Sequence, residues 1–392
     1  MPLWAILKLG GARSRAMGRH EELTHILGQH QRWLQSERQQ GARADLSGAE
    51  LDGVELAGAD LSGAVLRGVL LRNADLSRAR LIHADLRDAS LQDANLSGAN
   101  LMLTDFSGAD MLGANLTGVI SSGDLGQVRR GPRFRDADLR NALLAGAHCY
   151  ISDFTGANLA GAEMAGVMLE RAKLADTDLS ALDFSGANLC QADLRRCNLS
   201  DANLRGANLI HANLEEATLS RADVSGAALQ SANLANAKVD GIRYDRKARF
   251  QGIRVDSCYG SSRFKRHAQD QDYIEEFKAA HPYYYALWRG LTDCGRSMTR
   301  VVVWSATLAV FFGLVFYSLG REAFALSHPD TLPWSLFSMM YYSVVTFTTL
   351  GFGDITPRTP LAAALVMVEV VTGYLMLGIL ISILATKVAR RS

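Results

Sequence analysis

The sequence predicts a multidomain chain in which a solenoid of stacked coils precedes an all-α membrane domain with two spans. Three features of the 392 residues support this fold class. An apolar residue recurs at every fifth position through residues 44–240, two long apolar segments lie near the C-terminus, and a glycine-containing stretch separates those segments. A period of five fits neither an α-helix nor a β-strand, so the first part needs a coil with flat faces of five residues.

The composition excludes several functional classes. With 41 basic and 40 acidic side chains, the formal net charge is +1, which gives no electrostatic basis for binding nucleic acid. The five cysteines show neither paired spacing nor metal-ligand clustering, which is typical of thiols in a reducing compartment. The repeats carry no nucleophile–base pair, phosphate loop or metal cluster. We therefore expect a protein that is not an enzyme and has no cofactor.

Residues 1–43 are expected to form a tail and a cap for the solenoid. Apolar residues recur at roughly helical spacing between residues 20 and 40, and Gly41 marks a C-terminal stop for that helix. A solenoid needs a cap over its exposed terminal coil, so we expect the amphipathic helix to cover the first coil. Residues 1–19 are expected to be disordered.

Residues 44–240 hold the repeat. One series of apolar residues runs without a miss from Leu46 to Leu116, and a second series in a shifted phase runs from Phe134 to Val239. A small residue, nearly always alanine, stands two positions before each large one, and Asp or Asn often lies between them. We expect both the small and the large residue to point inward, so that stacked coils fill a narrow core and pair their backbones in ladders.

The Ala-Asp/Asn-Leu-x-x pattern resembles the pentapeptide-repeat family. The resemblance implies a right-handed quadrilateral β-helix with four repeats per coil. Arginines interrupt the acidic residues, so a rod that mimics DNA is disfavoured, and we expect a cytoplasmic scaffold or gating appendage that takes a ligand or a protein. The phase break predicts a loop at residues 119–133, whose arginines at 129, 130 and 133 are either solvated or in contact with lipid headgroups or an anion.

Residues 241–300 are expected to connect the repeats to the membrane domain. The first part is basic, and tyrosines, a tryptophan and arginines precede the first span, as at a membrane interface. This composition fits interfacial helices that pass movements of the repeats to the membrane domain. It fits a passive linker equally well.

Residues 301–390 are expected to form the membrane domain. The apolar pattern predicts an outer helix at 301–319, an inner helix at 361–386, and between them a short apolar helix at 333–346 with Pro333 in its first turn. Basic residues precede the first span and follow the second. Because basic residues favour the cytoplasmic side, this places both termini and the repeat domain in the cytoplasm.

The stretch from Thr346 to Asp354 lies between the two spans. Gly351 and Gly353 permit backbone conformations that are closed to other residues, so successive carbonyls can point to one side. Stacked carbonyl rings of this kind can replace the hydration shell of an ion. The stretch resembles the selectivity-filter signature Thr-x-x-Thr-x-Gly-Tyr/Phe-Gly-Asp of potassium channels, and its surroundings resemble bacterial channels with two transmembrane helices per chain.

That resemblance implies a homotetrameric potassium channel in the cell (inner) membrane, because each chain then supplies one quarter of the pore. The filter would be residues 349–353, completed by Gly353. K+ would permeate it on the carbonyls of Thr349, Leu350, Gly351 and Phe352. Phe352 replaces the commoner tyrosine and loses a hydroxyl, so a non-selective cation channel is one alternative. A membrane-anchored scaffold that binds a protein partner through the repeats is another.

Further residues are expected to support the filter or the gate. The supporting set is Thr346, Thr348, Asp354 and either Tyr341 or Tyr342, one of which would donate to Asp354. Glu369 is the only acid in the second span, and we expect it to lie behind the pore helix, bonded to Thr346 or Ser343. Gly373 falls on the family's hinge glycine and is either a gating hinge or a site of close helix packing. Gly378 is a second candidate hinge.

Overall fold

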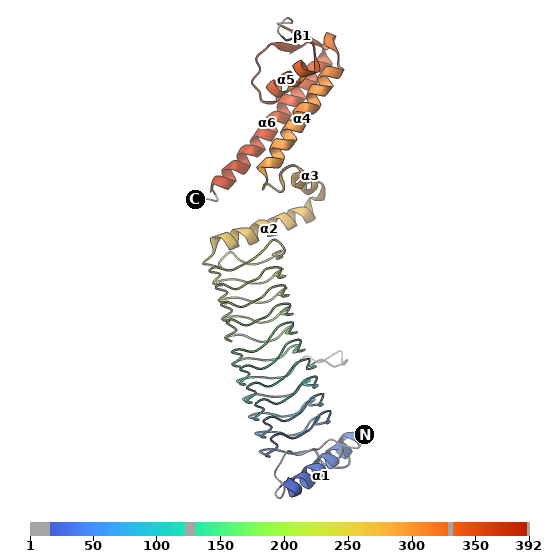
Figure 1. The fold of residues 1–392 in the computed structure, drawn as a ribbon, viewed down its shortest axis with the longest axis vertical. Coiled ribbons are helices and arrows are strands. Elements are labelled where there is room, and N and C mark those ends of the chain that lie inside the picture. Colours follow the sequence, from blue (N-terminus) through green and yellow to red (C-terminus); the bar gives the residue numbers. More distant parts are fainter. Residues whose placement is uncertain (1–15, 122–129, 328–331, 390–392) are drawn as a thin grey trace. The chain divides into compact units, whose positions relative to one another are not determined.

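The computed structural model describes residues 16–121, 130–327 and 332–389, which divide into two compact units, Met1–Tyr273 and Ile274–Ser392 (Figure 1). Helix α1 (Ala16–Gln35) precedes the repeats. The elements after the repeats are, in chain order, α2 (Ser262–Ala280), α3 (Pro282–Thr292), α4 (Met298–Ser318), η2 (Arg321–Ala323), β1 (Phe324–Leu326), α5 (Leu336–Phe347), β2 (Ile355–Pro357) and α6 (Pro360–Ala389).

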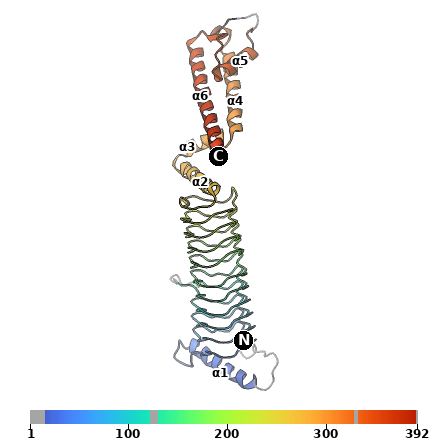
Figure 2. The ribbon, with the colours of Figure 1, turned by 90° about the vertical axis from the view of Figure 1, so that its left-hand side faces the viewer.

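The repeats of the first unit form a rod of stacked coils. Parallel backbone bridges join residues 20 positions apart, as in the pair Asp45 and Val65. The Leu46 N–H donates to the Val65 carbonyl at 2.8 Å, and the Val65 N–H donates to the Ala44 carbonyl at 2.9 Å. Because the sequence repeats every five residues, a 20-residue coil holds four repeats, and the coils stack along one axis (Figure 2).

The core of the rod is built from the small and large apolar residues, as the sequence predicts. Ala64 and Leu66, for example, are both 0% exposed. A β-turn closes each corner, and in the first repeat the Ala49 N–H donates to the Leu46 carbonyl at 3.1 Å. The third residue of that turn, Gly48, has a φ of 66°, a conformation that favours glycine, Asn or Asp.

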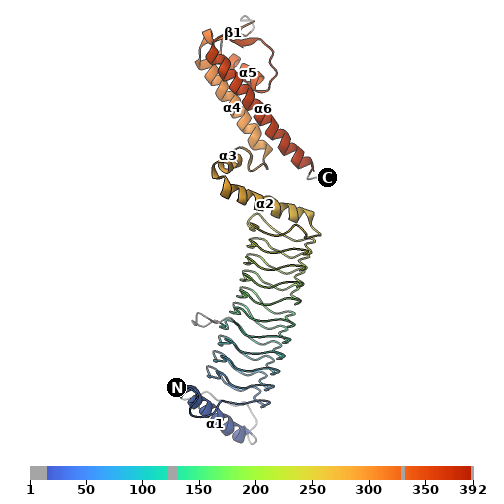
Figure 3. The same cartoon turned by 180° about the vertical axis from the view of Figure 1, so that it is seen from behind.

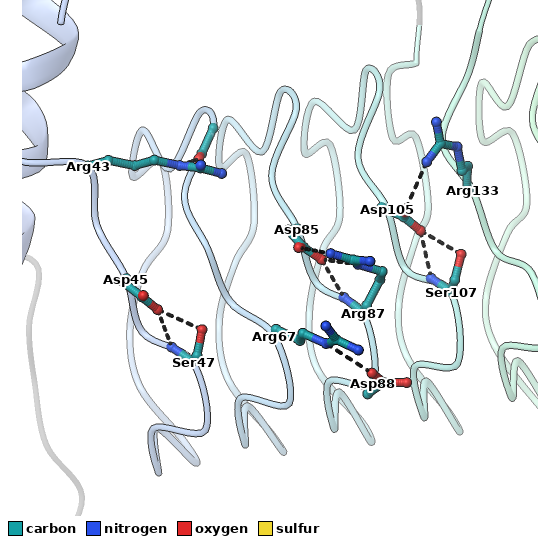
Figure 4. A network of polar contacts seen from close by, with 11 residues as sticks. Arg43, Asp45, Ser47, Arg67, Asp85, Arg87, Asp88, Asp105, Ser107 and Arg133 are labelled. Atoms are coloured by element: carbon teal, nitrogen blue, oxygen red, sulfur yellow. Dashed lines mark hydrogen bonds and ion pairs between the residues drawn. The ribbon is translucent and has the colours of Figure 1, made fainter.

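Ion pairs join acidic and basic side chains on the rod's outward surface (Figure 4). Arg87 pairs with Asp85 at 2.5 Å, and Arg133 pairs with Asp105 in the neighbouring coil at 2.9 Å. The hydrogen bonds from the Arg87 guanidinium hold the pKa of the Asp85 carboxyl below its ordinary value. Each of these ion pairs offsets one acidic charge on the rod's surface.

The predicted loop at 119–133 is too wide. Ile120 bridges Asn100, and Arg133 bridges both Asp105 and Asp153, so both ends of this range belong to the rod. Bridges across the phase break join residues 28 positions apart instead of 20, which corresponds to an insertion of eight residues. Residues 122–129, including Arg129, lie outside the described residues. The period is broken because the insertion is not a multiple of five.

The rod does not end at residue 240, where the sequence places the connector. Bridges continue to the pair Lys238 and Tyr259, and from Ala228 onward they join residues 21 positions apart. One additional residue in the last coil shifts the phase of the five-residue repeat, so the repeat is no longer visible in the sequence. The carboxylate of Asp245 stabilises the altered backbone. It accepts N–H donors from three residues, Gly226 at 2.8 Å, Lys247 at 3.0 Å and Ala248 at 3.0 Å.

Helices cover both ends of the rod. Leu23 and Leu27 of α1 are buried in the same core as the first coil, where the sequence places a cap. The helix ends at Gln35, before the predicted stop, because Glu37 and Arg38 take left-handed φ values of 53° and 77°. Phe264 of α2 is 0% exposed and closes the other end. The predicted disorder of residues 1–19 lies outside the described residues up to residue 15, and Ala16 onward is helical.

The second unit packs α5 beside α4 and α6 (Figure 3). Met298–Ser318 and Pro360–Val388 are long and apolar enough to cross a membrane. Helix α4 begins before the predicted residue 301, because the Ser297 side chain accepts the Arg300 N–H and caps it. Helix α5 begins at Leu336 rather than 333, because Ser335 caps it in the same way. Helix α6 extends beyond the predicted range at both ends, to Pro360 and Ala389.

Candidate functional site

The candidate site begins at the C-terminal end of α5, where the helix leads directly into the glycine-containing stretch. The Thr348 N–H donates to the Val344 carbonyl at 3.0 Å, and the Leu350 N–H donates to the Val345 carbonyl at 2.9 Å. The Thr348 hydroxyl also donates to the Val344 carbonyl, at 2.6 Å. These bonds fix the start of the stretch at the negative end of the helix dipole, which favours a cation there.

The backbone φ angles of the stretch alternate between positive and negative values from Thr349 to Gly353. Thr349, Gly351 and Gly353 have φ values of 62°, 50° and 76°, whereas Leu350 and Phe352 between them do not have positive φ. Alternation of this kind is compatible with successive carbonyls that point to one side of the chain. Left-handed backbone was predicted for the two glycines only. A β-branched residue such as Thr349 rarely adopts it, and strain of this kind concentrates at functional sites.

The far end of the stretch is hydrogen-bonded to Ser327, the residue directly after β1. The Ser327 N–H donates to the Asp354 carbonyl at 2.9 Å, and the Ser327 hydroxyl donates to the Gly353 carbonyl at 3.4 Å. Strands β1 and β2 pair antiparallel immediately beyond it. Of the two candidate tyrosines, Tyr341 is the one whose hydroxyl interacts most directly with the Asp354 carboxylate. No signal in the sequence pointed to Ser327.

A polar contact lies behind α5, inside the helix packing. Glu369 of α6 is 0% exposed, and its carboxyl is hydrogen-bonded to the Ser343 hydroxyl of α5. Ser343 also donates to the Ala309 carbonyl of α4 at 2.6 Å. Of the two expected partners of Glu369, Ser343 makes the bond. Thr346 instead interacts with Tyr342.

The two candidate hinge glycines occupy different environments. Gly373 is buried, and a Cβ atom at this position would stand 2.2 Å from the Phe347 carbonyl oxygen at the end of α5. Gly378 is exposed, and a Cβ atom there would meet nothing within 4 Å. The close approach of α6 to α5 therefore requires glycine at 373 and allows other residues at 378.

In a single copy of the chain, residues 348–353 of the stretch are exposed. The side chains of Leu350 and Phe352 leave these residues 62% and 65% exposed, which is unusual for large apolar residues outside lipid or an interface. Thr349, Gly351 and Gly353 are exposed as well. One copy thus leaves the backbone of these residues exposed and does not enclose an ion.

Two family models match the chain in the two regions that the fold separates. The model described as pentapeptide repeats matches 8 copies between residues 42 and 236, and the model described as an ion channel matches residues 298–390. The chain joins a pentapeptide-repeat domain to an ion channel domain. The ion channel domain contains α4, α5, α6 and the stretch between them. Neither family is one of enzymes.

A curated relative and solved structures are similar to parts of this chain. The two-pore potassium channel 4 of Arabidopsis thaliana is 34% identical over 95 residues, which cover 24% of this chain and 32% of the relative. The pentapeptide repeat protein HetL from Nostoc is 28% identical, covering 60% of this chain and 97% of HetL, with a TM-score of 0.29. A pentapeptide repeat protein from the thylakoid lumen of Arabidopsis thaliana is 23% identical, covering 35% of this chain and 69% of that protein, with a TM-score of 0.20. This chain thus spans about a third of the length of the potassium channel that it matches.

Proposed function

We propose that four copies of this chain form a potassium-selective channel, with residues 349–353 of each copy as one quarter of the selectivity filter. In this proposal the carbonyls of Thr349, Leu350, Gly351 and Phe352 replace the hydration shell of the permeant K+. The observation that carries the proposal is the alternating hand of the backbone from Thr349 to Gly353. The matched relative, which is named as a potassium channel, supports K+ as the ion.

The homotetramer is part of the proposal because one row of carbonyls cannot surround an ion. Neighbouring copies would complete the carbonyl rings and cover the exposed side chains of Leu350 and Phe352. Native mass spectrometry of the purified protein tests this assembly. A mass of four times 42.5 kDa supports it, and a monomer or dimer contradicts it.

The remaining residues act as supports in this proposal. Thr348 holds the start of the filter, and the interaction of Tyr341 with Asp354 supports its outer end. Ser343 and Glu369 hold α5 against α6 behind the filter. We place both termini and the right-handed pentapeptide-repeat rod on the cytoplasmic side of the cell (inner) membrane, because basic residues precede the first span and follow the second. There the rod would act as a scaffold or gating appendage for a ligand or protein.

The decisive experiment is a reversal potential of the full-length protein in a planar bilayer, with K+ on one side and Na+ on the other. A reversal near the K+ equilibrium potential supports the selective filter. Gly351→Ala is the matched variant, because a Cβ atom at a φ of 50° disfavours the filter backbone. This variant should abolish the current. Reversal near zero contradicts K+ selectivity.

A non-selective cation channel is the second candidate, and Phe352 favours it. A phenylalanine ring lacks the hydroxyl that could hold the filter against α5, so the filter would be wider or more mobile. Phe352→Tyr restores that hydroxyl. A wild-type reversal near zero that moves toward the K+ potential in Phe352→Tyr would establish this second candidate. A scaffold without conduction would give neither current nor ion flux in proteoliposomes.

A further inference from the structure

The charge of the repeat unit changes sign near its C-terminal end. Residues 44–237 carry 25 acidic and 16 basic side chains, whereas residues 238–266 carry 3 acidic and 9 basic side chains. Six exposed basic residues lie on the last coil and the first turns of α2, and we call them the basic collar: Arg246, Lys247, Arg249, Arg254, Arg263 and Arg266.

The three acids between residues 238 and 266 are occupied by other groups. Asp245 accepts three backbone N–H donors, and Asp256 accepts the Gln269 amide at 2.9 Å. Asp240 pairs with Lys238 at 3.6 Å, outside the collar. Many arginines of the mid-rod, in contrast, pair with carboxylates, as Arg196 does with Asp176 at 2.6 Å.

The four collar residues of the last coil have positive charges that are exposed and are not neutralised by a described carboxylate. Arg246, Lys247, Arg249 and Arg254 are exposed, and they have no ion pair within the part of the chain that the structure describes. Clustered cations of this kind attract an anionic surface, and the attraction adds up over the cluster.

The position of the collar in the chain indicates which anionic surface it meets. Its last residue lies 32 positions before Met298, where the first apolar span begins. Helix α3 lies between them, and its Tyr283 and Tyr284 are 90% and 69% exposed. Basic clusters next to exposed aromatic residues and a span are typical of segments that lie at lipid headgroups.

We propose that the basic collar binds the anionic headgroups of the bilayer that α4 and α6 span. This contact anchors the C-terminal end of the rod to the membrane surface. It requires that the two apolar helices insert into a bilayer, but it does not require that the ion channel domain conduct K+. An experiment can therefore contradict the binding of the collar to headgroups without contradicting K+ conduction, and the reverse.

The test uses full-length protein in lipid nanodiscs and an amine-reactive acetylating reagent, with labelling of each lysine followed by mass spectrometry. One set of discs contains phosphatidylcholine only, and the other contains about 30 mol % phosphatidylglycerol. Lys247 reports on the collar, and the exposed mid-rod Lys173 is the internal reference. We expect phosphatidylglycerol to slow labelling of Lys247 relative to Lys173 by about threefold or more, and about 0.5 M salt to remove the difference. Equal ratios in the two kinds of disc would overturn the proposal.

Matched double variants test the charge itself. Arg249→Gln/Arg254→Gln removes two collar charges, whereas Arg78→Gln/Arg171→Gln removes two exposed charges from the mid-rod. The ladders use backbone groups at all four positions, so the rod stays folded, which circular dichroism checks. The collar variant should lose most of the lipid protection of Lys247, and the mid-rod variant should keep it. Loss in both variants would indicate a general charge effect and contradict the collar.

Two further outcomes separate the membrane from other anions. Inorganic phosphate at about 10 mM is added to discs of phosphatidylcholine alone. If phosphate protects Lys247 as phosphatidylglycerol does, the collar is a site for a soluble anion and membrane docking is wrong. Protection that is already complete in phosphatidylcholine discs and insensitive to salt would point to a protein contact, which also overturns the proposal.

Discussion

The Ser343 hydroxyl lies between the Ala309 carbonyl, at 2.6 Å, and the buried carboxyl of Glu369. These three residues belong to α5, α4 and α6, so one side chain links the three helices behind the filter stretch. A serine hydroxyl has a single hydrogen. Both bonds form together only when the carboxyl contributes a proton of its own, which also avoids an unpaired charge in an apolar interior.

Removing this link should destabilise the helix packing. Ser343→Ala is expected to cost about 1–3 kcal/mol, because the buried Glu369 carboxyl loses its partner. Glu369→Gln should cost less than Glu369→Leu, because the glutamine amide can still donate to Ser343. The measurement is the thermal midpoint of the detergent-solubilised protein. Ser382→Ala, an exposed position on α6, is the control. Equal midpoints for Ser343→Ala and Ser382→Ala would show that the link contributes nothing.

The two glycines of α6 should respond differently to alanine. Gly373→Ala places a Cβ atom 2.2 Å from the Phe347 carbonyl oxygen, so α6 must move away from α5 at a cost of about 1–3 kcal/mol. Gly378→Ala meets nothing within 4 Å and should be neutral or stabilise the helix by up to about 1 kcal/mol. Thermal midpoints of the two variants make the comparison. If Gly373→Ala kept full stability and changed only opening of the channel, the hinge interpretation would be correct instead.

The repeat fold could be predicted from the sequence wherever the period of five continued. Leu66 and its equivalents are buried as expected, but the period alone failed after Arg243, where one additional residue shifts the phase. Asp245 compensates by binding three backbone N–H groups, and only the folded backbone reveals that role. The handedness of the coil stays a prediction.

The candidate site was partly predictable for a similar reason. Gly351 and Gly353 are recognisable because few other residues tolerate their backbone, whereas Thr349 has the same left-handed φ against its own preference. Helix spacing left Glu369 with two candidate partners, and the packing of α5 on α6 selects Ser343. The roles of these residues in conduction stay predictions.

The rod should lose stability in acid. Hydrogen bonds from Arg87 and Arg140 lower the pKa of Asp85 and Asp138 below the ordinary 3.8. A carboxyl whose pKa is lower in the folded state stabilises the fold above its unfolded pKa, and that stability is lost as pH falls through the folded pKa. The thermal midpoint of the rod, followed by circular dichroism, should therefore fall as pH decreases below about 4.

The control for this pH dependence is Arg87→Gln/Arg140→Gln. Without the guanidinium groups, the pKa of each carboxyl returns toward its ordinary value, so the double variant should lose less stability between neutral pH and acid than the wild type does. Parallel curves for the two proteins would show that other groups control the acid sensitivity.

The aromatic stack beside the eight-residue insertion should hold the neighbouring coils together. The Phe134 ring stacks on Phe106 and Phe154, with centroids 5.3 Å and 4.8 Å away, and all three are 0% exposed. Phe134→Ala should cost about 3–5 kcal/mol of unfolding free energy, and Phe134→Leu much less. Phe184→Ala, which removes an equally buried ring, is the control. The stack should make Phe134→Ala worse by about 0.5–1.5 kcal/mol, and a smaller cost than in the control would contradict it.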